Sequence, residues 1–335
     1  MTVPILDPFG AARDPTMLFL EEALDPPQAE ERLTRLLEAP WRLREIRIVR
    51  YKPQTRCLVE YDLVSDRSDA ITVLGKAAAW GLDVPTYRIY RDLWRQGFSD
   101  ASGDGVSIPE PLGMIPEFHM WFQRKVPGAL AGDLLHLPGG VKLAGRIADA
   151  VHKLHLSNIP TPRHHTMQAE LDVLHKRLAV VAESRPEWAA RLEDLLAFCD
   201  RLGASVPEPE PSRVHRDLYQ DHVIVNGRRL YVLDLDLYAR GDAAVDAGNF
   251  LAHLMEWGLR GLGNPDALAD PEAAFERRFL ELAGADRGPA VRAYKFLSLV
   301  RLISISTQIP DRRAFTEPIL RLCEAKHREL AAVPA

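Results

Sequence analysis

Two segments of the chain carry side chains that could transfer a phosphoryl group: HRDLYQDH at 215–222 and YVLDLDLYARGD at 231–242. Such a transfer requires a carboxylate to orient and deprotonate the accepting hydroxyl, a cation on the phosphates, and a metal ion between them. The NGR turn predicts a β-hairpin over 222–234, which brings Asp217 and Asp234 to one rim. One of the two can serve as the base and the other as a metal ligand. The joint pattern carries this hypothesis, since a lone His-x-Asp also arises by chance.

The elements before these segments predict a β-rich lobe of five strands and one helix. Apolar residues alternate over 44–64, where the turn KPQT indicates a hairpin, and a third strand follows at 70–78. A helix is expected at 85–96, with Pro85 at its start. Two further strands are expected near 112–115 and at 118–126. Ahead of them, 16–38 shows two short amphipathic helical patterns.

The second half is helical by its periodicity. Helices are predicted at 140–156, 168–182, 187–202, 244–259, 271–284, 288–306 and 315–332. The hairpin at 222–234 is the one β element expected there. We therefore expect a helical extension over 1–40, a β-rich nucleotide-binding lobe over 41–125, and a helical lobe with the catalytic loop and substrate site over 126–335.

Composition limits the class of protein. The 335 residues suit two lobes, and the net charge of -5 with a pI near 6.1 argues against a nucleic-acid partner. Three widely spaced cysteines exclude a disulfide framework and fit a reducing compartment. No secretory signal is visible, and the apolar stretch 296–306 is broken by Arg301 and too short to span a bilayer. We expect a cytoplasmic protein without membrane contact, and no sequence feature indicates an obligate protein partner.

The segment HRDLYQDHVIV, followed by LYVLDLDLYARGDAAVDAGNFLAHL, resembles the signature of the aminoglycoside phosphotransferase and choline kinase family. The resemblance covers about residues 41–320 and is most specific over 213–254. It implies an α+β, protein-kinase-like fold with a small β-rich N-lobe and a larger, mainly helical C-lobe. It also implies ATP-dependent transfer of the γ-phosphoryl group to a hydroxyl of a small molecule (an amino-sugar, an amine alcohol or a sugar), with ATP and Mg²⁺ as cofactors.

The resemblance assigns roles to several of these residues. Asp217 falls at the position of the catalytic base, and Asp234 at the metal-binding aspartate. Asp236 is either a metal or substrate contact or only a solvated acid. Structural support of the catalytic loop is implied for His215, Asp242 and Asp246.

The nucleotide side is expected in the first lobe. An ammonium at Lys76, on a strand otherwise filled with apolar residues, requires a partner, and phosphate could supply one; the alternative is that it extends to solvent at the strand edge. Family members pair this lysine with a helix glutamate, but 85–96 offers only Asp92. Gln123 and Lys125 lie where the hinge of the family meets adenine, mostly through backbone groups.

His222 departs from the family pattern, which has asparagine there as a second metal ligand. Imidazole suits softer ions than Mg²⁺, so Mn²⁺ is a possible alternative metal. Three interpretations stay open: one metal suffices, His222 contacts the metal through water or binds phosphate, or turnover is weak or absent. The last makes the chain a kinase-fold protein that binds a nucleotide or small molecule.

The acceptor is expected between helices that follow Asp246. Glu256, with other acids at 266–276, could meet a cationic acceptor, and Trp257 could stack on it. A protein kinase is disfavoured, because no DFG-like glycine and no A-P-E segment are found. A histidine-based hydrolase is also disfavoured, because we expect His164 and His165 to lie in an exposed loop.

Overall fold

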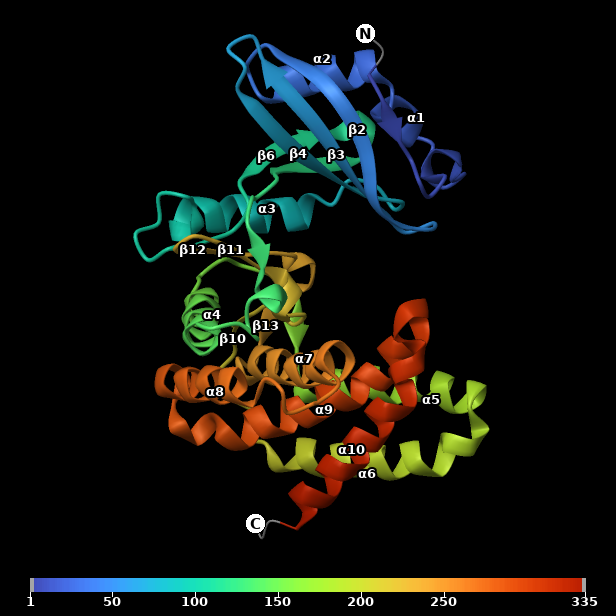
Figure 1. Ribbon diagram of the computed structural model, residues 1–335, viewed down its shortest axis with the longest axis vertical. Helices are drawn as coiled ribbons and strands as arrows, with labels where there is room; N and C mark the ends of the chain where they lie inside the picture. The colour runs from blue at the N-terminus through green and yellow to red at the C-terminus, as the bar shows by residue number, and fades with distance from the viewer. Residues whose placement is uncertain (1–2, 333–335) are drawn as a thin grey trace. The chain divides into compact units, whose positions relative to one another are not determined.

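The computed structural model describes residues 3–332 and divides them into two compact units. The first unit runs up to Gly128 and also includes Asn226–Leu233. The second consists of Ala129–Val225 and the described residues from Asp234 onward. The first unit is rich in strands and the second is mainly helical, which confirms the predicted α+β class (Figure 1).

The first unit contains a six-stranded sheet with the order β1-β2-β3-β4-β7-β6. Its strands are β1 (Ile5–Leu6), β2 (Trp41–Lys52), β3 (Arg56–Ser65), β4 (Ala70–Ala78), β6 (Pro111–Ile115) and β7 (Met120–Arg124). The sequence predicted five of them. The sixth, β1, pairs in parallel with β2, and two residues are too few to show an alternating pattern.

Strand β4 carries Lys76 through the middle of this sheet. Lys76 lies opposite Trp121 of β7 in the register. Its neighbour Gly75 allows the strands to approach closely, because a Cβ there would lie 2.7 Å from Met120 Sδ and 2.9 Å from a ring carbon of Phe122. Helix α3 (Val84–Leu93) follows, with Asp83 as its N-cap.

The helices ahead of the sheet, α1 (Leu20–Ala23) and α2 (Pro26–Leu36), pack against it. Met17, Leu20 and Leu33 are fully buried in the same core cluster as the apolar side chains of β2, β3 and β4. Asp14 accepts hydrogen bonds from the Tyr51 hydroxyl and from the backbone N–H of Gln54, each at 2.8 Å. The N-terminal segment therefore anchors the turn between β2 and β3.

The second unit contains all the helices that were predicted for the second half of the chain. They are α4 (Gly140–His155), α5 (Met167–Ser184), α6 (Ala189–Ser205), α7 (Ala244–Leu262), α8 (Ala269–Ala283), α9 (Gly288–Gln308) and α10 (Thr316–Ala331). Helix α9 is buried on most sides and packs against α5, α6, α7 and α10 (Figure 1). None of the helices described is both long and apolar enough to cross a membrane.

The second unit also contains strands that the sequence did not predict. A three-stranded sheet has the order β10 (Ser212–Val214), β13 (Ala239–Gly241) and β9 (His164–His165). The prediction of an exposed loop at His164 and His165 is therefore wrong, since pairing in β9 exposes the first side chain and buries the second. The predicted strands at 222–234 are β11 (Val223–Asn226), paired with β8 (Ala129–Leu130), and β12 (Arg229–Val232), paired in the first unit with β5 (Val106–Ser107).

Candidate functional site

Asp246 of α7 holds the loop that follows β10 through hydrogen bonds. This aspartate is fully buried and accepts hydrogen bonds from the backbone N–H of His215 at 2.8 Å and of Arg216 at 2.6 Å. Nε2 of His155 donates a third bond at 2.9 Å. Burial opposes the charge of Asp246, but these partners hold its pKa below the ordinary value. The carboxylate therefore stays ionised and fixes the start of the loop.

The backbone at the two ends of the site adopts the left-handed region. Arg216, just before Asp217, has φ of 70°, and Asp234 has φ of 56°. For non-glycine residues such conformations cost about 1–3 kcal/mol and persist only where the surroundings hold them, often at functional sites. At Arg216 the bond to Asp246 supplies that restraint.

His222 joins Asp217 to Asp234. Its Nδ1 donates to the backbone carbonyl of Asp217 at 2.7 Å, and its Nε2 lies 3.6 Å from Oδ2 of Asp234. Burial, followed by the proximity of His215, lowers the pKa of His222 to about 4. The ring is therefore neutral at pH 7, with its proton on Nδ1 and a lone pair on Nε2 beside the carboxylate.

This pair of donors fits a divalent metal that is completed by other ligands. A histidine that gives one ring N–H to a carbonyl presents the other nitrogen as a ligand, and Mg²⁺ is commonly held by one or two carboxylates together with phosphates and waters. Over residues 3–332, no group of three or more His, Cys, Asp or Glu side chains forms a complete metal site. His222 and Asp234 would therefore supply two ligands and the nucleotide the others.

Two other predicted residues lie beside this pair. His215 is fully buried, stacks on His222 at a centroid distance of 5.6 Å, and its Nδ1 accepts from the backbone N–H of Asp217 at 3.3 Å. Asp236 is half-buried in the short helix after Asp234, and its backbone carbonyl accepts from Arg163. The structure thus brings Asp217, His222 and Asp234 together, with His215 packed behind them.

His253 was not predicted as a site residue, although it lies near Asp217. Burial lowers its pKa to about 3, while the charge of Asp217 acts in the opposite direction. Its ring stacks on Tyr219 at 4.8 Å, and its buried Nε2 has no hydrogen-bond partner among the described residues. The spacing of the sequence motif did not indicate it, because it lies on α7, more than thirty residues after Asp217 in the chain.

A second unpredicted residue, Asp221, lies in a cluster of mixed charge. Burial raises its pKa, Arg312 and Arg260 oppose that shift, and Glu256 adds to it. Glu256 is 1% exposed, and its Oε1 accepts from Arg260 Nε at 2.8 Å. Its other oxygen, Oε2, is buried and accepts no hydrogen bond from the described part of the chain. Glu256 is therefore an interior acid.

The other residues considered for the acceptor site, and Asp242, have different surroundings. Trp257 is half-buried and lies 5.5 Å from the ring of His136. Glu272 is paired with Lys295, so it is not a free surface acid. Asp242 lies at the entrance to α7, where it accepts from the backbone N–H of Ala244.

In the first unit, Lys76 Nζ lies 5.1 Å from the ring centroid of Trp121 and 5.6 Å from that of Tyr90. Cation–π contact of this kind stabilises an ammonium away from water. Asp92 contacts Arg91 at 2.8 Å.

The predicted hinge residues are also placed. Gln123 is buried on β7, and its Oε1 accepts no hydrogen bond from any described group. Lys125 donates its backbone N–H to Thr72 and pairs through Nζ with Glu60 at 2.7 Å.

Comparison with solved structures gives the fold. A thermostable mutant of an aminoglycoside phosphotransferase, in ternary complex with AMP-PNP and hygromycin B, matches at a TM-score of 0.61 with 17% identity, over 91% of this chain and 99% of that chain. A choline/ethanolamine kinase family protein from Mesorhizobium loti matches at 0.53 with 18% identity, over 95% and 94%. An amicoumacin kinase in complex with AMP-PNP, Ca²⁺ and Ami matches at 0.53 with 12% identity, over 83% and 88%. The chain therefore has the kinase-like fold of these proteins.

Sequence comparison identifies the family. No curated protein matches the chain significantly. The model of the phosphotransferase enzyme family matches residues 85–294, which include Asp217, His222, Asp234 and Asp246. The chain belongs to the phosphotransferase enzyme family.

Proposed function

We propose that this protein transfers the γ-phosphoryl group of ATP to a hydroxyl group of a small molecule. The observation that carries the proposal is the placement of Asp217 and Asp234 on either side of a neutral His222, on a loop fixed by Asp246. Phosphoryl transfer depends mainly on positioning and electrostatic stabilisation, and this arrangement provides a fixed base next to a metal-binding pair.

In this proposal Asp217 accepts the proton of the substrate hydroxyl as its oxygen approaches the phosphorus. Its backbone is held by the hydrogen bond that His222 Nδ1 donates to its carbonyl. A divalent metal, when bound, neutralises charge on the phosphate oxygens. Asp234 and the Nε2 lone pair of His222 would hold it, while Lys76, with Gln123 and Lys125, serves the nucleotide.

The acceptor, in this proposal, lies next to His253 and Tyr219. Because His253 is neutral over the physiological pH range, its Nε2 can accept a hydrogen bond from a hydroxyl or an ammonium group. Asp221 and Glu256 add carboxylates to the same region, where Arg312 and Arg260 offset part of their charge. The acceptor in this proposal carries an amine, as an amino-sugar or an amine alcohol does.

The test is an ATP-consumption screen of the full chain against amino-sugars, amine alcohols, neutral sugars and nucleosides, with Mg²⁺ and with Mn²⁺. We expect turnover with at least one amine-bearing alcohol, and loss of that turnover in Asp217→Asn. Binding of Mg·ATP without turnover of any acceptor would favour a nucleotide-binding protein, and absence of ATP binding would contradict the proposal.

A further inference from the structure

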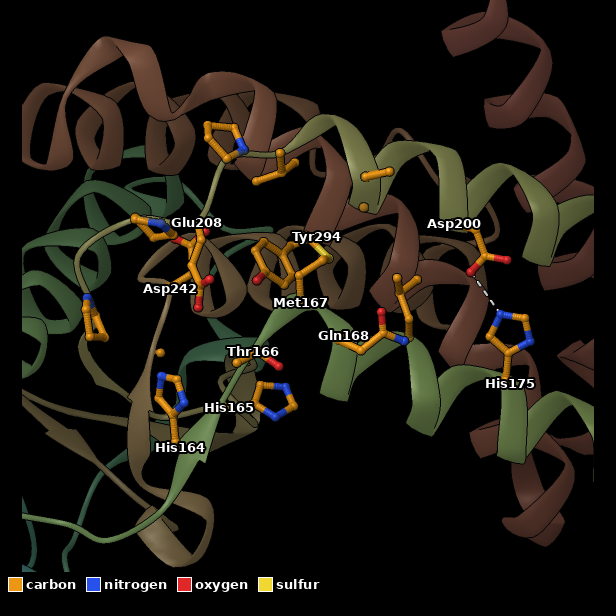
Figure 2. Close-up of a pocket in the computed structure, with 18 residues that line it drawn as sticks. His164, His165, Thr166, Met167, Gln168, His175, Asp200, Glu208, Asp242 and Tyr294 are labelled. Atoms are coloured by element: carbon orange, nitrogen blue, oxygen red, sulfur yellow. Dashed lines mark hydrogen bonds and ion pairs between the residues drawn. The ribbon is translucent and has the colours of Figure 1, made fainter.

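The second unit contains a cavity of about 700 Å³ whose lining includes no residue of the loop 215–222 and neither Asp234 nor Asp236. Its walls come from β9 and the start of α5, the end of α6, the proline-rich segment 206–211, and residues next to them (Figure 2). Met167, Leu171 and the prolines of that segment form the aliphatic part of the wall, and polar side chains form the rest.

Asp242 lines this cavity and is only 6% exposed. Its Oδ1 accepts from the backbone N–H of Ala244 at 2.9 Å and from Arg287 at 2.5 Å. Its Oδ2 is buried and accepts no hydrogen bond from the residues that the structure describes. A buried carboxylate oxygen without a donor is costly, so a donor supplied by a ligand would bind favourably at this position.

Other groups make this end of the cavity acidic. Figure 2 draws Glu208, Asp242 and Tyr294 together at one end of the cavity. Burial raises the pKa of the Tyr294 phenol, and the charges of Asp242 and Glu208 raise it further. Two acids, one of them with an unpaired oxygen, therefore lie at this end of the cavity, next to a phenol that retains its proton.

The opposite end of the cavity has a third acid. Asp200 lies there, beyond Met167 and Gln168, with its Oδ1 bonded to Nε2 of His175 at 2.9 Å (Figure 2). No three-residue metal cluster exists in the described chain, which disfavours a bare metal ion as the ligand. Acids at both ends of a cavity, with aliphatic side chains between them, match an elongated aliphatic amine that carries more than one positive charge.

A continuous series of buried side chains connects the cavity wall to the catalytic loop. His165, which lines the cavity, donates to Glu170 at 2.8 Å, and Arg301 donates to the other oxygen of Glu170 at 2.6 Å. Arg301 also bonds Asn249 at 2.5 Å, and Asn249 donates to the carbonyl of Leu218 at 2.8 Å. Leu218 immediately follows the proposed base.

We propose that this cavity is a second binding site, for an elongated aliphatic amine cation, and that its occupation stabilises the catalytic loop. The amine donates to Asp242 Oδ2 and Glu208, and its chain lies along the aliphatic wall. Ordering of the wall around the ligand restricts His165 and, through Glu170, Arg301 and Asn249, the backbone of the loop. Site and loop are then coupled, so that each favours the ordered state of the other.

The site is tested by calorimetric titration of spermidine into the full chain without nucleotide or metal. Glu208→Gln should weaken binding about tenfold, the size expected for loss of a charge-assisted contact of about 1.4 kcal/mol. The matched control is Glu210→Gln, an exposed acid of the same segment that does not line the cavity; it should leave the affinity unchanged. Triethylene glycol, a neutral chain of similar kind, should not bind.

Two results would overturn the site. One is an affinity that is the same in Glu208→Gln and Glu210→Gln, which would indicate binding to the general acidic surface. The other is an affinity that is lost in Asp221→Asn and retained in Glu208→Gln, which would assign spermidine to the acceptor region instead.

The coupling is tested by hydrogen exchange of the amides of 215–222. At a spermidine concentration near the Kd of the parent, exchange should slow several-fold in the parent and much less in Glu208→Gln. Glu170→Gln should keep the spermidine affinity, but spermidine should no longer slow exchange in this variant. If Glu170→Gln does not fold, the comparison of the parent with Glu208→Gln still tests whether occupation of the cavity slows exchange in the loop. Unchanged exchange in a parent chain saturated with spermidine would contradict the coupling. Neither measurement uses turnover, so both are independent of the proposed kinase activity.

Discussion

Two polar regions of the second unit differ in how completely their side chains are paired. In the groups that hold the loop 215–222, both oxygens of Asp246 and both oxygens of Glu170 accept hydrogen bonds from protein groups. In the proposed acceptor region, Nε2 of His253 and one oxygen of Glu256 receive none from the described residues. The groups of the first region hold the backbone of the loop in place, whereas those of the second region can still form hydrogen bonds with a ligand.

The largest effect is expected from replacing Asp217, the proposed base. Asp217→Asn should reduce turnover by at least two orders of magnitude, because a general base typically contributes about 10²–10⁴-fold. ATP binding and thermal stability should stay near those of the parent, as measured by steady-state kinetics and calorimetry. Turnover within a few-fold of the parent would exclude Asp217 from the mechanism.

Removing a fully hydrogen-bonded acid of the first region should lower the stability of the fold. Asp246→Ala leaves two buried backbone N–H groups and His155 without their acceptor, so the free energy of unfolding should fall by about 2–4 kcal/mol. The control is Asp149→Ala, which removes an exposed acid that pairs with Arg278 and should change stability by less than about 1 kcal/mol. Denaturant titration measures both. Equal losses in the two variants would show that Asp246 does not support the loop.

Variants in the two units should affect different parts of nucleotide binding. Mg·ATP at 100 times its Kd should stabilise the folded chain by about 2.7 kcal/mol if it binds only that state. Asp234→Ala should remove the metal-dependent part of the shift in melting temperature, and Lys76→Ala should weaken the ATP-dependent part. Lys153→Ala provides a control lysine on α4. Absence of any shift with nucleoside triphosphates, with or without metal, would contradict the nucleotide site.

The smallest effect concerns the metal preference set by His222. If its Nε2 is a ligand, the parent should work as well or better with Mn²⁺ than with Mg²⁺, and His222→Asn should favour Mg²⁺. Because the pKa of His222 is lowered to about 4, its protonation should reduce activity near pH 4, well below the ordinary histidine range. The same metal preference and pH profile in parent and variant would exclude ligation.

The lowered pKa also has a consequence for stability. The unfolded chain binds the proton near the ordinary value of 6.5, whereas the folded chain binds it only near 4. The contribution of neutral His222 to stability is therefore complete above pH 6.5 and is lost as the pH falls from 6.5 to 4. His222→Asn should reduce this loss, while His253, with a pKa lowered to about 3, should maintain part of it. Unfolding measured across this range separates the two.

Local sequence determined most of the elements. The alternation of β2, β3 and β4 and the periodicity of the helices from α4 to α10 are properties of short windows, and the structure confirms them. The two-residue strands β1 and β9 were not predicted, because such short strands are defined only by pairing with β2 and β13. The family signature in 213–254 was likewise readable, because its residues have fixed spacing along one loop and the elements that follow it.

Tertiary structure alone decided the surroundings of these residues. The tautomer of His222 depends on the carbonyl of Asp217, and the burial of Glu256 depends on how α7 packs; neither is encoded in residue type. The series from His165 through Arg301 to Leu218 joins groups far apart in the chain, so no periodic pattern could indicate it. Residue type fixes which charges are available, whereas desolvation and hydrogen-bond partners, which set pKa values and ligand-binding capacity, arise only when distant segments pack together.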